Sequence, residues 1–254
     1  MIAELLAHHS HRALILLVAA AFIASLARGF SGFGGALIFV PLASAAVGPQ
    51  AAAPILLVID GIAQLALLKS AWREANRREV GIMAAGALVG IPLGAAALAY
   101  VDAITLRWAI VALVVAMLAL LMSGWRYHGQ PNVPTTVGVG FSAGSLSGAV
   151  QAAGPPVVAY WLGGSSSALT MRANIILFFF CTSVVAGISY LATGLLGPGV
   201  LLLSALTAPG YALGMFLGTR MFGLASDVMF RRVCFAMIAA AAVVSLPVLD
   251  SVLR

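Results

Sequence analysis

Two glycine-rich polar stretches interrupt the apolar helices of this chain, one in each half of the sequence. The first runs from Arg28 to Gly35, and the second combines Gly144–Gly148 with Gln151–Pro156. Glycine and proline at this density interrupt a helix. In hydrocarbon every freed backbone N–H and C=O needs a partner, so such breaks persist only inside protein or beside a cavity. Paired breaks at matching places in two halves are typical of a transporter's binding site.

The composition is that of a multi-pass membrane protein. Hydrophobic residues make up 63% of the 254 residues and charged residues only 8%, against about 25% charged in a soluble domain. The net charge of +6 comes mostly from basic residues that flank apolar runs. We therefore interpret it as a membrane-orientation signal and expect no nucleic-acid partner. Cys181 and Cys234 lie in apolar runs, so we interpret them as buried apolar side chains.

The apolar segments predict one all-α integral membrane domain built from two repeated halves. The first half, residues 1–128, holds a broken segment at 13–47 and helices at about 51–68, 80–100 and 104–125. The second half, residues 129–254, holds a broken segment at 135–162 and helices at about 175–193, 200–222 and 233–249. These six helices reach crossing length. The two arms of the first break are about 22 Å and about 18 Å long at 1.5 Å per residue. Neither arm is therefore long enough to cross the membrane.

Charge placement favours re-entrant hairpins for both broken segments. In that arrangement the basic loop 69–78 is cytoplasmic together with Arg126, Arg172 and Arg231, and fewer arginines lie outside. If each broken segment crossed once, the basic residues would be divided almost evenly, against the positive-inside rule. Three full crossings in each half would make the halves inverted repeats. Both arrangements stay open.

A second internal match supports the duplication. Gly86, Gly90 and Gly94 lie four residues apart in the first half, and a second triplet repeats that spacing at the corresponding place, at Gly210, Gly214 and Gly218. Small residues at this spacing let helices approach closely. We therefore expect both triplets to pack against neighbouring helices.

The polar groups of the two breaks form the candidate substrate site. Arg28 has a planar, charged guanidinium group at membrane depth, which suits an oxyanion. Alternatively, the arginine side chain extends back to the membrane surface. The helix that starts after each break offers backbone N–H groups and a partial positive charge. The Gln151 side chain either binds substrate or holds the break together by hydrogen bonds, a role that we call the staple. The predicted substrate-binding residues are Arg28, Ser31, Gly32, Gly34, Gly35, Ser147, Gly148, Gln151, Gly154 and Pro155.

A carboxylate within a clear span is the candidate for coupling. Asp60 is flanked by apolar residues, and Gln64 follows one turn later on the same helix face. Asp60 either takes up a proton or pairs with Arg28, and we favour the pairing. Arg172, Asn174 and Arg220 lie near predicted helix ends, where an interfacial role is the simpler interpretation.

The two motifs resemble those of the sulfite exporter TauE/SafE family, also called the 4-toluene sulfonate uptake permease family. The resemblance covers essentially the whole chain and is strongest over Arg28–Pro41 and Ser147–Pro156. The first motif is shorter than the common family form, and Gln151, Ala152 and Ala153 stand where more glycine is usual. The resemblance implies a multi-pass plasma-membrane secondary transporter that exports sulfite, sulfonate or a related organosulfonate by alternating access.

Two other functions stay open, namely an anion channel-like pore and an accessory membrane subunit without transport activity of its own. A channel would more often repeat a charged or carbonyl ring about a symmetry axis. The sequence contains no phosphate-binding loop, zinc-ligand spacing or nucleophile elbow, so we expect neither an enzyme nor a cofactor or metal. The expected partners are a small anion, membrane lipid and the proton as coupling ion. The oligomeric state is open, and a homodimer is one candidate.

Overall fold

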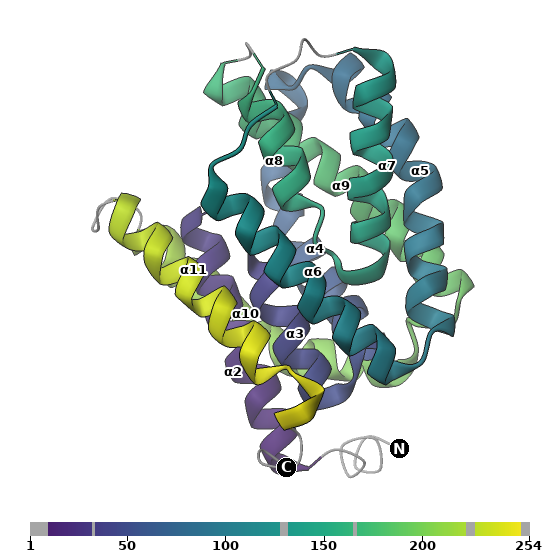
Figure 1. Cartoon of the computed structure of the whole chain (residues 1–254), viewed down its shortest axis with the longest axis vertical. Helices are drawn as coiled ribbons and strands as arrows, with labels where there is room; N and C mark the ends of the chain where they lie inside the picture. Colours follow the sequence, from purple (N-terminus) through teal and green to yellow (C-terminus); the bar gives the residue numbers. More distant parts are fainter. Residues whose placement is uncertain (1–9, 32–33, 128–131, 165–166, 222–226, 250–254) are drawn as a thin grey trace. The chain divides into compact units, whose positions relative to one another are not determined.

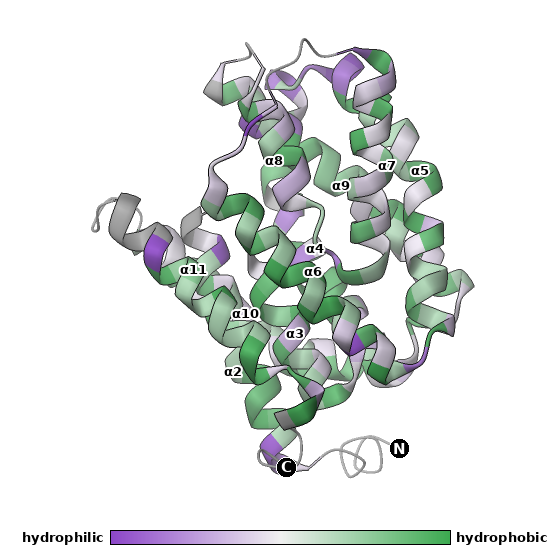
Figure 2. Ribbon diagram, viewed as in Figure 1, coloured by the Kyte–Doolittle hydropathy of each residue, from purple (hydrophilic) through white to green (hydrophobic). Residues whose placement is uncertain are grey.

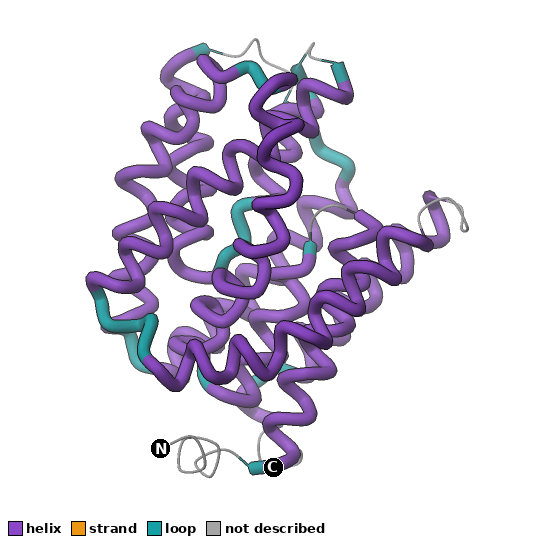
Figure 3. Tube along the Cα trace, turned by 180° about the vertical axis from the view of Figure 1, so that it is seen from behind, coloured by secondary structure: helices purple, strands orange, loops and turns teal. Residues whose placement is uncertain are grey.

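The computed structural model describes residues 10–31, 34–127, 132–164, 167–221 and 227–249. Every regular element in these ranges is a helix, and they contain no strand (Figure 3). Five helices of the described part are long and apolar enough to cross a membrane, and a sixth joins them if the bent helix α4 (Pro49–Glu74) counts as one span. The predicted all-α membrane fold is therefore confirmed. The five crossing-length helices lie within α2 (His11–Ser31), α5 (Arg77–Tyr100), α6 (Ala103–Ser123), α9 (Ala168–Ala192) and α10 (Pro198–Met221).

Helix bodies carry large apolar side chains on their exposed faces. Leu88 on α5, Ile188 on α9 and Leu213 on α10 are each more than half exposed. Figure 2 shows hydrophobic residues along most of the helix bodies. Such surfaces suit contact with lipid, because soluble proteins rarely expose so much apolar area to water. The chain is a multi-pass membrane protein.

The lengths of several helices differ from those predicted. Helix α4 continues to Glu74 instead of ending at 68, and α9 begins at Ala168 instead of 175. Helix α2 has 21 residues and passes through Arg28, so at about 31 Å it is long enough to cross alone. The prediction that the first arm is too short was wrong, because it counted apolar residues only and polar residues extend the helix at both ends. Helix α11 (Asp227–Val244) ends before the predicted residue 249, because Pro247 disfavours helix in the residue before it. Its apolar part, Arg232–Val244, is shorter than a membrane crossing, so the prediction of a crossing-length helix over 233–249 was wrong.

Helix contacts divide the chain into two compact units. The first unit takes its described residues from Met1–Ile59, Val101–Met122 and Leu195–Arg254, and the second takes them from Asp60–Tyr100 and Ser123–Gly194. The first unit thus contains α2, α6, α10, α11 and α3 (Gly35–Val47), and the second contains α5, α9, α7 (Val133–Val150) and α8 (Gly154–Leu162). Each unit combines helices from both halves of the sequence and contains one broken segment.

Glycine contacts explain the packing of the second unit. Helices α5 and α7 run side by side in contact (Figure 1). A Cβ atom added at Gly90 would collide with the carbonyl oxygen of Phe141 on α7, and one added at Gly148 would collide with that of Ile91 on α5. Because glycines of both helices meet the partner's backbone, the two helix axes approach closely.

The first unit repeats this arrangement with α10 and α2. A Cβ atom at Gly218 would collide with the carbonyl oxygen of Leu26, and one at Gly29 would collide with that of Met215. The prediction that both glycine triplets pack against helices is therefore confirmed. In each unit, the triplet-bearing helix of one half packs on the first arm of the other half's broken segment, a correspondence that supports the proposed duplication.

Candidate functional site

The first break lies between α2, which ends at Ser31, and α3, which begins at Gly35. Gly34 precedes α3 with φ of 89°, in the left-handed region. A Cβ atom at Gly34 would meet nothing within 4 Å, so backbone conformation rather than crowding requires glycine at this position. The predicted residue Gly32 lies outside the described residues, and only the backbone of Ser31 is described.

Arg28 and Gly35 meet at this break. Gly35 is buried, and a Cβ atom there would lie 3.1 Å from the Cβ of Arg28 and 3.2 Å from the carbonyl oxygen of Ala24. The glycine therefore lets the start of α3 pack directly on α2 and on the stem of Arg28. Arg28 itself is half-buried. The structure thus places the stem of Arg28 against Gly35 at the start of α3, and Gly34 directly precedes that helix.

The second break is shorter than the sequence suggested. Helix α7 continues through Gly144–Gly148 to Val150, so the prediction that this glycine stretch interrupts the helix was wrong. Close packing on α5 outweighs the helix penalty of glycine, which is only about 1 kcal/mol per residue. The interruption is confined to Gln151–Ala153, and Gln151 has a left-handed φ of 57°. A non-glycine residue in this region costs roughly 1–2 kcal/mol, which contacts of its side chain must offset.

Hydrogen bonds of the Gln151 side chain supply those contacts. Its Nε2 donates to the Ser147 carbonyl at 3.0 Å and to the Tyr190 hydroxyl at 3.2 Å. The Tyr190 hydroxyl in turn donates to the Gly148 carbonyl at 2.7 Å. Of the two roles considered for Gln151, this geometry favours the staple over direct substrate binding. Tyr190 was not predicted from the sequence, although a tyrosine within an apolar span carries a hydroxyl that needs a hydrogen-bond partner.

Helix α8 starts directly after the staple. It begins with Gly154, and Pro155 and Pro156 follow without N–H groups. The first N–H groups of a helix have no acceptor within it, so the first turn of α8 presents the N–H of Gly154 and the partial positive charge of the helix end. Ser147 and Pro155 are buried, and Gly154 is half-buried. The five site residues predicted for the second half thus lie around one break.

A buried polar chain joins α4 to α9 in the second unit. Gln64 donates through Nε2 to the Asp60 carboxylate at 2.7 Å, and its Oε1 accepts from the Ser183 hydroxyl at 3.4 Å. Asp60 is 8% exposed and Gln64 7%. The prediction that Asp60 and Gln64 share a helix face is confirmed, whereas Ser183 was not predicted. Arg28 belongs to the first unit and Asp60 to the second, so their pairing stays a prediction.

Two polar residues have structural contacts that the sequence did not indicate. Asn174 is fully buried, accepts the Asn76 backbone N–H at 2.7 Å and donates to Glu79 at 3.3 Å. It therefore fastens the turn between α4 and α5 to α9. Arg107 is also buried and donates to the Ser245 carbonyl at 3.0 Å, where a positive charge suits the carboxyl end of α11.

The described residues contain no group of three or more His, Cys, Asp or Glu placed to hold a metal ion. Cys181 is half-buried, Cys234 is buried, and neither forms a disulfide. The described groups at the breaks that can bind an anion by charge and hydrogen bonds include the Ser147 hydroxyl, backbone N–H groups and the Arg28 guanidinium.

A family model described as Sulfite exporter TauE/SafE matches residues 17–245. Comparisons with curated proteins and with solved structures give no match. The matched range covers nearly the whole chain and includes both breaks and the buried Asp60. Family membership implies export of sulfite or a related small anion, so the chain is a membrane transporter and not an enzyme. The protein belongs to the sulfite exporter TauE/SafE family.

Proposed function

We propose that this chain is a secondary transporter that exports sulfite, or a related small organosulfonate, across the plasma membrane by alternating access. The family match supports the substrate class and the direction. One observation carries the mechanism: each compact unit contains one broken helix, α2–α3 in the first and α7–α8 in the second. Broken helices of this kind hold the binding sites of many secondary transporters.

The proposed donors for the anion are groups at the start of α3 and at the start of α8. The backbone at Gly34, Gly35 and Gly154 contributes N–H donors where the helix dipole favours negative charge. Arg28, whose stem packs on Gly35, contributes a guanidinium that can donate two parallel hydrogen bonds to one sulfite or sulfonate group. In this proposal Ser31 and Ser147 add hydroxyl groups, Gly32 and Gly148 give the backbone room, and Pro155 orients α8.

We further propose that Asp60 balances the charge of Arg28 when the site is empty. The Gln64 side chain, which also accepts a hydrogen bond from Ser183, donates to the Asp60 carboxylate at 2.7 Å and so fixes its position on α4. An arriving anion then competes with Asp60 for the guanidinium, and a proton on Asp60 eases the exchange. With the basic loop 69–78 on the cytoplasmic side, this step couples export of the anion to movement of a proton.

Counterflow in liposomes tests the transport mechanism. Purified protein is reconstituted with unlabelled sulfite trapped inside, and radiolabelled sulfite is added outside. A carrier accumulates labelled sulfite inside the liposomes transiently above its equilibrium level. This happens because a binding site that has released unlabelled sulfite outside takes up labelled sulfite before it turns inward again. A channel-like pore would equilibrate the label without overshoot, and an accessory subunit would give no flux above that of protein-free liposomes. Arg28→Gln protein serves as the matched control and should abolish the overshoot.

A further inference from the structure

Tyr190 connects α9 to the second break from a fully buried position. Its hydroxyl donates to the Gly148 carbonyl at 2.7 Å and accepts from Gln151 Nε2 at 3.2 Å. The tyrosine is 0% exposed. Both of its partners belong to the last turn of α7 or to the break itself, so one side chain from another helix contacts the segment where the chain changes direction.

These bonds satisfy groups that the end of a helix leaves open. The last four carbonyl groups of a helix have no N–H partner within it. At the end of α7, the Ser147 carbonyl accepts both the backbone N–H of Gln151 and its side-chain Nε2, each at 3.0 Å. The Gly148 carbonyl accepts from Tyr190. The left-handed backbone of Gln151 turns its side chain back over this turn, which makes the two bonds to Nε2 possible.

The same bonds determine which groups remain for a substrate. Both N–H bonds of the Gln151 amide are directed at protein acceptors, and its remaining oxygen is an acceptor that does not suit an anion. The donor presented at the second break is therefore backbone, at the first turn of α8, three residues beyond the staple. The direction of the Gly154 N–H depends on the backbone of residues 151–153, which the hydrogen bonds of Gln151 and Tyr190 hold in place.

We propose that Tyr190 is a positioning residue for anion binding: through Gln151 it orients the second break so that the Gly154 N–H at the start of α8 faces the substrate. The inference rests on the proposed function, because it assigns α8 to the transported anion. It also predicts that the Gln151 amide does not contact the anion, in contrast to one of the two roles considered from the sequence.

The test removes only the hydroxyl group. Tyr190→Phe should raise the KM for sulfite about two- to tenfold, the range for one hydrogen bond, while the maximal rate per folded protein stays near that of the wild type. Folded protein is counted by gel filtration, and thermal stability is measured for each variant. An unchanged KM would overturn the inference, whatever the effect on stability.

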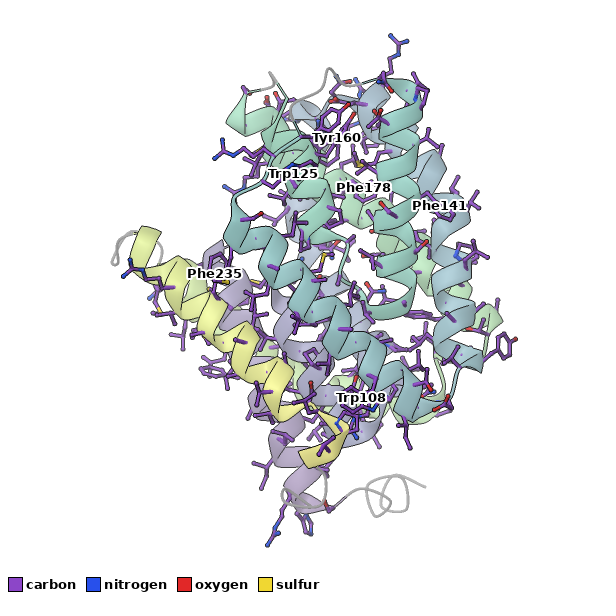
Figure 4. All side chains as sticks on the ribbon, in the orientation of Figure 1. Trp108, Trp125, Phe141, Tyr160, Phe178 and Phe235 are labelled. Atoms are coloured by element: carbon purple, nitrogen blue, oxygen red, sulfur yellow. The ribbon has the colours of Figure 1, made fainter. Side chains whose placement is uncertain are left out.

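Tyr160→Phe is the matched control. Tyr160 is a buried tyrosine of the same unit, and its hydroxyl shares one hydrogen bond with Thr136 in the first turn of α7. Figure 4 shows Tyr160 on α8, toward the end of that helix rather than the break. This variant should lower thermal stability as Tyr190→Phe does, but leave the KM unchanged. A rise in KM of equal size in both variants would show a general loss of packing and contradict a role specific to Tyr190.

A double-mutant cycle with Gln151→Leu completes the test. If Tyr190 acts through Gln151, the double variant should have about the same KM as the single variant with the higher KM, because both changes remove the same contact. Effects that multiply would overturn the inference. The proposed function fails separately: wild-type liposomes that show no sulfite flux refute it, whereas active wild-type protein with an unaltered Tyr190→Phe KM refutes the positioning role alone.

Discussion

Replacing Gly90 by alanine should separate α5 from α7. The added Cβ atom would collide with the Phe141 carbonyl oxygen and lie 2.8 Å from the Ser145 backbone nitrogen. Non-bonded carbon atoms need about 3.5–4.0 Å, so the helices must part by roughly 1 Å. Both neighbours are backbone atoms of a packed helix, and neither can rotate away as a flexible side chain would.

The expected loss of stability follows from two opposing terms. Forcing an extra carbon into a packed contact costs about 1–3 kcal/mol, while replacing a helical glycine by alanine gains about 1 kcal/mol. We place Gly90→Ala toward the upper end of the packing cost, because Gly86 and Gly94 on the same face are equally close to α7. The net destabilisation should therefore be about 1–2 kcal/mol.

Gly81→Ala provides the control on the same helix. Gly81 is exposed, and a Cβ atom there would meet nothing within 4 Å, so only the helix-propensity gain remains. Thermal unfolding of both variants in the same detergent should give a lower Tm for Gly90→Ala and an equal or higher Tm for Gly81→Ala. If Gly90→Ala unfolds at or above the wild-type temperature, the two helices are not in backbone contact and the packing argument is wrong.

Three other changes test the charged groups. Arg28→Lys keeps the charge but loses the planar fork, so the sulfite KM should rise at least several-fold at equal expression, and a wild-type KM would refute the anion contact. Asp60→Asn should flatten the pH dependence of transport, and an unchanged pH profile would make Asp60 structural. Asp102 directly precedes α6, and the Thr105 backbone N–H, 2.9 Å from its carboxyl, lowers the pKa of that carboxyl below 3.8. The contribution of Asp102 to stability therefore exists above about pH 3.8 and disappears as the pH falls through the lowered pKa. Thermal melts should therefore show Asp102→Ala less stable than the wild type at pH 7 and the difference shrinking in acid, whereas a constant difference would contradict this role.

At the second break, the low helix propensity of glycine did not predict where the helix ends. Glycine at 144 and 148 is unfavourable in an isolated helix, so the sequence predicted an interruption there. In the protein those two glycines face α5, and contact with that helix holds α7 helical to Val150. Gly34 differs, because its positive φ is a local property of the backbone, and the first break was predicted within a few residues.

The sequence by itself was enough to predict those features of the protein that depend on composition and on residues close together in the chain. Low charge and long apolar runs predicted a helical membrane protein. Four-residue spacing predicted that Asp60 and Gln64 share a helix face and that α5 and α10 carry glycine faces. Only the tertiary structure decided which helix each glycine face meets, and which side chains complete the polar groups. Tyr190 reaches a carbonyl 42 positions away in sequence, and Ser183 reaches Gln64 across 119. No local pattern specifies such partners, because a buried hydroxyl requires some acceptor but helix packing alone determines which acceptor comes within reach.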